Sequence, residues 1–426
     1  MLSEDGTSME ESMTACASPS SVLEPAGLAF ATDCVHINHS STADNYNASA
    51  FPIYATATFK QASASTMGQF DYTRSGNPTR LHLEAHLAKV IRGSCRALAV
   101  SSGMTALDII IRTLIRSTDQ EIVTGDDLYG GSNRLLSTLA NKTHHVDTTD
   151  LAAIENVLSH EKTRLVLLET PTNPLMKIAD IRGIVALVRE KAPNAIIAVD
   201  NSMMSPYLQS CLQLGCDIEY HSGTKFIGGH HDLMAGVIGI RDPSLAERVF
   251  FIVNATGAGL APFECFLLMR GVKTLPLRMD KQQSNAIAIC NHLEATYGFR
   301  ILYPGSKSHP QRELHASQAS GPGAVLAFTT GDVELSKRIT EAVVLFAISV
   351  SFGCVNSLIS MPGKRPRLTR FRVGYMSHAS IPKEVRDARE FPEDLVRLCI
   401  GIEDADDLIQ DLDTAIKKSL QYPKNV

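Results

Sequence analysis

The sequence lacks the features that mark membrane and exported proteins. No apolar run approaches the roughly 18 residues that a membrane-spanning helix needs. The first thirty residues contain no Arg or Lys, which argues against both a secretory signal and an Arg-rich transit peptide. The final Lys424-Asn425-Val426 is no peroxisomal address. We therefore expect a cytoplasmic protein whose polar first residues form a disordered head.

Charge and cysteine usage exclude further classes. The net charge of −5 comes without a basic stripe, so we expect neither nucleic acid nor a membrane as a partner. The nine cysteines form no Cys-x-x-Cys pair and show no metal-ligand spacing. This pattern predicts free thiols in a reducing compartment and no metal site.

The order of apolar segments predicts an α/β fold. A helical pattern at 81–90 is followed by short apolar runs at 97–100, 121–124 and 165–168, with helices between them. Strands that alternate with helices indicate a mostly parallel sheet. After residue 261 the pattern changes: helices are expected at 262–269 and 272–292, and strands of a smaller domain at 324–329 and 346–352.

One lysine stands in an unusual place. Lys225 lies between Ser222, Thr224 and the pair Gly228-Gly229, just after an apolar segment. Burial there would lower its pKa and free a neutral amine, the usual state of a Schiff-base lysine. The neighbouring hydroxyls would suit an anion such as phosphate. In this window alone, a lysine in an ordinary turn is equally compatible.

An aspartate upstream favours the chemical interpretation. Asp200 ends the apolar run 195–199, where open α/β sheets place ligand-binding groups. Taken alone, Asp200 would be a helix N-cap. A lysine for an imine together with an acid for a pyridinium nitrogen is the pair that pyridoxal phosphate requires.

Three motifs carry a resemblance to a known family. Asp200-Asn201, Ser222-Gly223-Thr224-Lys225 and the run 231–236 resemble the cofactor core of the pyridoxal-phosphate enzymes of Cys/Met metabolism, over about residues 35–413. The resemblance implies pyridoxal 5'-phosphate as cofactor and a fold of type I, with a mostly parallel large domain and a smaller α/β C-terminal domain. It also implies a homotetramer built from dimers with shared active sites. The expected divisions are a disordered head at 1–34, an arm to the neighbouring subunit at 35–76, a cofactor domain at 77–271 and a substrate domain at 272–426.

The resemblance assigns roles to individual residues. The expected catalytic residues are Lys225, Tyr129 and Tyr72. The expected cofactor ligands are Lys225, Asp200, Ser222, Thr224, Ser102, Gly103, Met104, Tyr129, Asn173 and, from a neighbouring subunit, Tyr72 and Arg74. The expected substrate ligands are Arg397, Ser351 and Asn173. Considered without the family, Tyr129 would be a core tyrosine and Arg74 would more often be a surface ion-pair partner. Arg397 stands in an apolar run and needs an acid partner or an incoming carboxylate.

Within the family, the chain is most similar to the cystathionine β-lyases of plants and fungi. This implies a β-elimination that converts cystathionine to homocysteine, pyruvate and ammonia. Val350 stands where the γ-acting synthases and lyases usually carry Glu. Two alternatives stay open: a γ-acting enzyme, or a non-catalytic member disabled by the basic insertion at 363–374.

Overall fold

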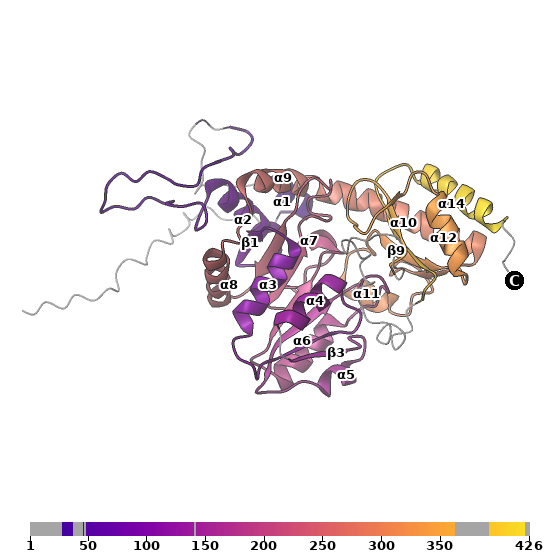
Figure 1. The fold of residues 1–426 in the computed structure, drawn as a ribbon, viewed down its shortest axis with the longest axis horizontal. Coiled ribbons are helices and arrows are strands. Elements are labelled where there is room, and N and C mark those ends of the chain that lie inside the picture. The colour runs from indigo at the N-terminus through magenta and orange to yellow at the C-terminus, as the bar shows by residue number, and fades with distance from the viewer. Residues whose placement is uncertain (1–27, 37–45, 47, 140–141, 363–391, 422–426) are drawn as a thin grey trace, which may run out of the picture.

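The protein has a large and a small domain, each built on a β-sheet (Figure 1). The computed structural model describes residues 28–36, 46, 48–139, 142–362 and 392–421. In this part of the chain, the large sheet has seven strands in the order β1-β7-β6-β5-β4-β2-β3. They are β1 (Arg96–Val100), β2 (Glu121–Gly125), β3 (Lys142–Val146), β4 (Thr163–Glu169), β5 (Ile196–Asp200), β6 (Ile218–Ser222) and β7 (Gly236–Ile240). Strands β2 to β6 pair in parallel, and both pairings of β7 are antiparallel.

Helices cover both faces of this sheet. They are α2 (Pro78–Val90), α3 (Gly103–Leu114), α4 (Gly130–Leu139), α5 (Leu151–Glu155), α6 (Ile181–Lys191), α7 (Ser205–Leu208), α8 (Pro243–Thr256) and α9 (Pro262–Val272). Because successive strand residues point to opposite faces, Leu165 and Leu167 of β4 pack with α3 and α8, whereas Val166 and Leu168 pack with α6. Burial on both faces explains why β4 reads as a continuous apolar run.

Local sequence signals fix where two important helices begin. Asn77 caps α2, since its side chain accepts hydrogen bonds from the N–H groups of Thr79 and Arg80, and Pro78 stands at the first helical position. Ser102 caps α3 by accepting from Thr105 N. The cap of α3 follows directly on β1, so the chain turns from strand to helix at the carboxyl end of that strand.

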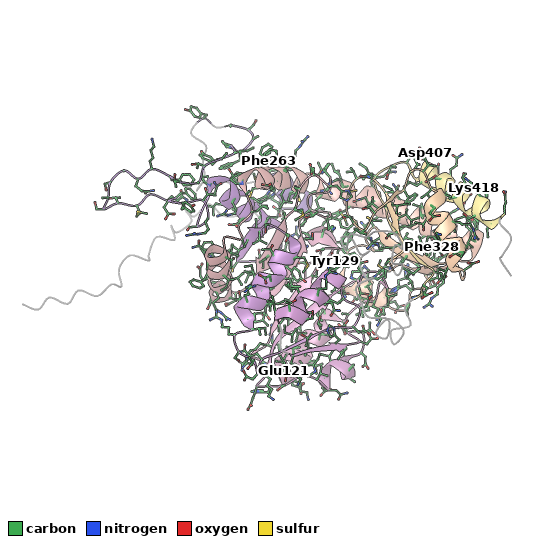
Figure 2. All side chains as sticks on the ribbon, viewed as in Figure 1. Glu121, Tyr129, Phe263, Phe328, Asp407 and Lys418 are labelled. Carbon is green, nitrogen blue, oxygen red and sulfur yellow. The ribbon has the colours of Figure 1, made fainter. Side chains whose placement is uncertain are left out.

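The small domain is held by a separate core. Its sheet has the order β10-β11-β12-β9-β8. The elements are α10 (Leu275–Tyr297), β8 (Arg300–Leu302), α11 (Arg312–Gln318), β9 (Val325–Thr329), α12 (Val333–Ala342), β10 (Ala347–Ile348), β11 (Leu358–Ser360), β12 (Leu395–Cys399) and α14 (Ala405–Leu420). Phe328 of β9 lies in this core (Figure 2), where Leu293 of α10, Ile339 of α12 and Leu412 of α14 also pack.

The N-terminal region departs in part from the predicted division. Residues 1–27 of the predicted head lie outside the described residues, but α1 (Phe30–Val35) is a helix that buries Asp33 and Cys34. The prediction that disorder extends to residue 34 is therefore wrong for these residues. Further along, an extended segment closed by an antiparallel bridge between Thr58 and Tyr72 projects from the large domain (Figure 1, indigo).

The α/β fold with a mostly parallel sheet is confirmed, and the differences are local. The strand predicted at 346–352 is only β10, because the chain leaves the sheet after Ile348. The helix predicted at 272–292 begins at Leu275 and ends at Tyr297. The insertion at 363–374 lies outside the described residues. Among the helices that the structure describes, none combines the length and apolar character needed to span a membrane.

Candidate active site

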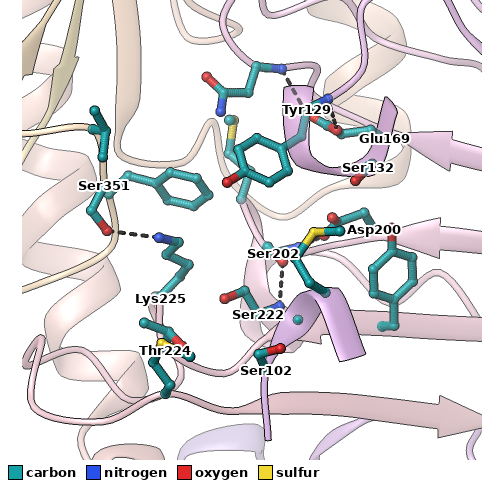
Figure 3. A pocket seen from close by; sticks show the side chains of 18 residues that line it. Ser102, Tyr129, Ser132, Glu169, Asp200, Ser202, Ser222, Thr224, Lys225 and Ser351 are labelled. Atoms are coloured by element: carbon teal, nitrogen blue, oxygen red, sulfur yellow. Dashed lines mark hydrogen bonds between the residues drawn. The ribbon is translucent and has the colours of Figure 1, made fainter. Parts of the chain in front are cut away.

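A cavity of about 500 Å³ opens where β4, β5 and β6 end, at the boundary with the small domain (Figure 3). The carboxyl ends of parallel strands are where open α/β sheets bind ligands. The residues that line the cavity are Ser102, Gly103, Met104, Tyr129, Ser132, Glu169, Asn173, Asp200, Ser202, Met203, Tyr220, Ser222, Thr224, Lys225, Met234, Val350, Ser351 and Phe352. Most of the predicted site residues are thus brought together in one place.

Lys225 lies in the turn after β6 and points into the cavity. Its amine donates a hydrogen bond of 2.8 Å to Ser351 Oγ and lies 5.1 Å from the centre of the Phe352 ring. Burial, with the positive charge of Arg397 as a second cause, lowers the pKa of Lys225 to about 8. A substantial fraction of the amine is therefore neutral near that pH and able to act as a nucleophile or a base.

The turn that carries Lys225 is held from two sides. On one side, Gly353 of the small domain approaches so closely that an added Cβ would lie 2.6 Å from Phe226 N, and its φ of +82° also favours glycine. On the other side, the buried Arg278 of α10 donates to the carbonyls of Phe226 (2.6 Å), Ile227 (3.2 Å) and Gly271 (2.8 Å). Both contacts come from the small domain, which therefore fixes the position of a lysine carried by the large domain.

Two carboxyl groups stand side by side at the carboxyl end of the sheet. Glu169 ends β4, Asp200 ends β5, and the two residues are partners in the parallel pairing. Ser202 N donates to Asp200 Oδ1 at 3.0 Å. Burial raises the pKa of Asp200, and burial together with the facing charge of Asp200 raises the pKa of Glu169 well above its usual range. Two such groups do not readily ionise together.

Several hydroxyl side chains line the cavity together with the first turn of α3 (Figure 3). Ser102 and Thr224 both line the cavity, and Ser222, the last residue of β6, is fixed through its backbone N–H, which donates to Ser202 Oγ at 2.6 Å. Hydroxyls next to the N–H groups of a helix N-terminus form a favourable setting for a phosphate group.

Arg397 is buried on β12 and contacts the cavity through other residues. Its guanidinium donates to Asn173 Oδ1 at 2.9 Å and to the carbonyls of Val350 (3.1 Å) and Ser351 (3.0 Å), while Nε has no hydrogen-bond partner in the described structure. These acceptors are neutral, and no carboxylate of the described residues forms an ion pair with it. A buried cation without an acid is costly, so an incoming carboxylate would satisfy this arginine.

Tyr72 and Arg74 are the predicted site residues that lie away from the cavity. Both are exposed on the extended N-terminal segment, where the Arg74 guanidinium carbon lies 5.4 Å from the centre of the Tyr72 ring. The prediction that they complete the site of a neighbouring subunit stays a prediction.

Comparison with known proteins identifies the family. The family of Cys/Met metabolism PLP-dependent enzymes matches residues 31–417. The chain belongs to this family. Its members depend on pyridoxal phosphate, so this protein is an enzyme with pyridoxal 5'-phosphate as its cofactor.

Named relatives extend the comparison. A cystathionine β-lyase of Neurospora crassa is 54% identical over 93% of this chain and 84% of its own, and one of Schizosaccharomyces pombe is 50% identical over 91% and 96%. Among solved structures, the cystathionine γ-lyase of Lactobacillus plantarum, complexed with L-serine, superposes with a TM-score of 0.85 at 33% identity, over 92% of this chain and all of that one. The fold of the family is therefore also the fold of this protein.

The residues of the cavity fit the family's cofactor. Asp200 is a partly buried carboxyl group, and a protonated pyridine nitrogen would offset the cost of removing its negative charge from water. The Lys225 amine lies across the cavity from Asp200, within reach of an aldehyde (Figure 3). The hydroxyl groups beside α3 match a phosphate.

Several lining residues were not predicted to act in the site. They are Ser132, Glu169, Ser202, Met203, Tyr220, Met234 and Phe352. A usable signal existed for Glu169, because it is an acid at the carboxyl end of a buried strand, which is the pattern that pointed to Asp200. Met203 and Phe352 carry no such signal, since apolar residues read as core.

Proposed function

We propose that this protein is a cystathionine β-lyase, which converts cystathionine and water to homocysteine, pyruvate and ammonia in methionine biosynthesis. The proposal is supported by the β-lyases that are 50% and 54% identical to it, against 39% for a cystathionine γ-lyase of Dictyostelium discoideum. The structural observation that carries it is a single cavity that holds the Lys225 amine, the Asp200 carboxyl group and, through Asn173, the guanidinium of Arg397.

Each end of the cavity would hold a different part of the cofactor. Bound pyridoxal phosphate supplies an electron sink for the carbon next to the substrate amine. Asp200 would pair with the ring nitrogen, and Tyr129 would stack on the ring. Ser102, Ser222 and Thr224, with the N–H groups of Gly103 and Met104, would hold the phosphate. The side chain of Asn173 would lie near the phenolic oxygen of the ring.

Lys225 would carry the proton transfer. Its pKa of about 8 allows the freed amine to accept the proton from Cα of the substrate. The bond between sulfur and the three-carbon arm then breaks, and its electron pair leaves with the sulfur of homocysteine. Addition of water to the three-carbon fragment yields pyruvate and ammonia.

The rim of the cavity would select and orient the substrate. Arg397 would bind the α-carboxylate, with Ser351 and Asn173 beside it. Val350 lines the cavity, is 52% exposed and offers no carboxylate, whereas γ-chemistry requires a second proton to be removed, at Cβ. An apolar side chain here favours the shorter β-elimination.

The proposal extends to assembly and compartment. Tyr72 and Arg74 would reach the cofactor phosphate of a neighbouring subunit, Tyr72 also acting in catalysis, within a homotetramer built from dimers. The exposed position of both residues on a projecting segment supports such a contact. We place the enzyme in the cytoplasm, and the eight cysteines among the described residues, all of them free thiols, fit a reducing compartment.

The decisive experiment is identification of the keto acid. Purified protein is incubated with cystathionine, and the keto acid is identified by its mass. Pyruvate as the main product, with no synthase activity on O-acylhomoserine plus cysteine, is the expected result. Mostly 2-oxobutyrate would overturn the β-lyase in favour of a γ-acting enzyme. Protein that is not yellow and forms neither acid would instead indicate a disabled family member.

A further inference from the structure

Glu169 links two loops at the mouth of the cavity. Its side chain is 8% exposed and accepts two backbone hydrogen bonds, one per oxygen. Oε2 accepts from Tyr129 N at 3.0 Å, and Oε1 accepts from Asn173 N at 3.0 Å (Figure 3). One carboxyl group therefore fixes the backbone of two residues that belong to different strand-to-helix connections.

Both contacts of Glu169 lead to groups that face a ligand. The Tyr129 side chain lines the cavity. Asn173 lines it as well, and its Oδ1 accepts from Arg397 Nη1 at 2.9 Å. Displacing the backbone at Asn173 would consequently displace the acceptor that holds the buried guanidinium.

The position of Glu169 is itself tightly determined. It pairs with Asp200 in the β4–β5 register, so sheet hydrogen bonds fix the strand backbone that leads to Glu169. A carboxyl group presents two oxygens in a fork, and both keep acceptor capacity when one of them carries a proton, which matches two N–H groups that converge from different loops. No other common side chain of this length offers the same pair of acceptors.

We propose that Glu169 is a positioning residue, which sets the Tyr129 ring against the cofactor and the Asn173–Arg397 pair against the substrate carboxylate. This inference rests on the proposed function for its substrate but not for its cofactor. Glu169 transfers no proton in this account, and its effect passes through the two backbone contacts.

Glu169→Gln tests this role in the full-length holoenzyme. The amide keeps the size of the side chain but has a single acceptor oxygen, so one of the two N–H groups would face an NH₂ group. Glu169→Asp keeps the carboxyl group but is one methylene shorter, so it reaches only one of the loops. The matched control is Glu84→Gln, a partly buried glutamate that accepts from Ala99 N at 3.0 Å and does not line the cavity.

Three measurements separate positioning from general stability. The first is the division of any loss between kcat and KM for cystathionine. The second is the dissociation constant of pyridoxal phosphate, followed by its visible absorbance. The third is hydrogen exchange of the amides in the peptides that contain Tyr129 and Asn173. Since small misplacements near a reacting group cost about 10²-fold in rate, we expect kcat/KM to fall by about that factor in both Glu169 variants.

The expected pattern also includes a higher KM, weaker cofactor retention and faster exchange in one or both of the two peptides, with none of these in Glu84→Gln. A kcat/KM within about threefold of the parent in both Glu169 variants, a small change on the scale of tenfold per 1.4 kcal/mol, would overturn the proposal. So would losses equal to those of the control. If the parent protein fails to cleave cystathionine, the proposed function falls, while cofactor retention and amide exchange still decide the role of Glu169.

Discussion

Replacing Arg278 should show how strongly the turn that carries Lys225 depends on the hydrogen bonds that Arg278 donates to its backbone. Arg278 is 5% exposed, and burial lowers its pKa to about 10, so it remains charged at neutral pH. Its guanidinium donates to three backbone carbonyls, and Nε donates to Thr274 Oγ1 at 3.0 Å. Two of those carbonyls, at Phe226 and Ile227, belong to the residues directly after Lys225.

The expected loss of stability in Arg278→Met follows from the carbonyl acceptors that would be left without a donor. Each buried carbonyl that loses its donor costs about 1–3 kcal/mol, which gives about 3–9 kcal/mol for the three in Arg278→Met. The variant also removes the penalty of burying a cation, which amounts to several kcal/mol and offsets part of that loss. We therefore expect a net destabilisation near the lower end, about 3 kcal/mol. The stability of Arg278→Lys should lie between that of Arg278→Met and that of the parent protein, because one ammonium group cannot reproduce the planar fork of a guanidinium.

The assay is urea unfolding of the holoenzyme, followed in parallel by far-UV circular dichroism and by cofactor absorbance. The cofactor signal of Arg278→Met should be lost at lower urea than the helical signal, because the turn loosens before the domains unfold. Arg92→Met is the control: Arg92 also donates to a backbone carbonyl, that of Leu28, but is partly exposed, so its loss should stay within about 0.5 kcal/mol. Equal urea midpoints of the cofactor signal in Arg278→Met and Arg92→Met would show that Arg278 does not support the turn.

Four further predictions concern Lys225, Arg397 and the N-terminal segment. Lys225→Ala should abolish the borohydride-reducible link to the cofactor and slow elimination by at least about 10²–10⁴-fold; a reduced adduct on another lysine would contradict this. Cofactor uptake by the apoenzyme should accelerate about tenfold from pH 7 to 9 and then level off, since a pKa of about 8 leaves the amine neutral above it. Arg397→Gln should move that midpoint upward, because it removes a like charge; an unchanged midpoint contradicts this cause. Mixing Arg74→Ala with Lys225→Ala should restore activity through hybrid sites, and subunits that exchange without recovery would exclude a shared site.

Much of the fold could be predicted because the sequence pattern and the burial agree. Strand β4 is apolar along its length since both faces are covered, and the alternation of strands and helices leaves few other topologies. The predicted strand at 346–352 failed for a different reason. The apolar side chain of Phe352 packs beside the Lys225 turn, so the hydrophobicity of Phe352 reflects a contact between domains and not a strand. The next residue, Gly353, adopts a positive φ.

The residues of the candidate site could be predicted where their type is unusual for the surrounding sequence. Lys225 and Asp200 stand out because a charge at the end of an apolar run is unusual. Glu169 bears the same mark, but its two backbone contacts exist only once the loops after β2 and β4 have converged. No sequence signal indicates the role of Arg278, since a single arginine in a long helix looks like a surface residue.

The bond between Asn173 and Arg397 joins residues that are 224 positions apart in the chain. At about 5–20 residues per second during synthesis, Arg397 is made some 10 to 45 s after Asn173. The cofactor ligands of this chain, the last of which is Lys225, are therefore synthesised well before the arginine that would recognise a carboxylate. The turn that carries Lys225 gains its contacts with Arg278 and Gly353 in between, so the group that would select a substrate is the last part of the site to be made.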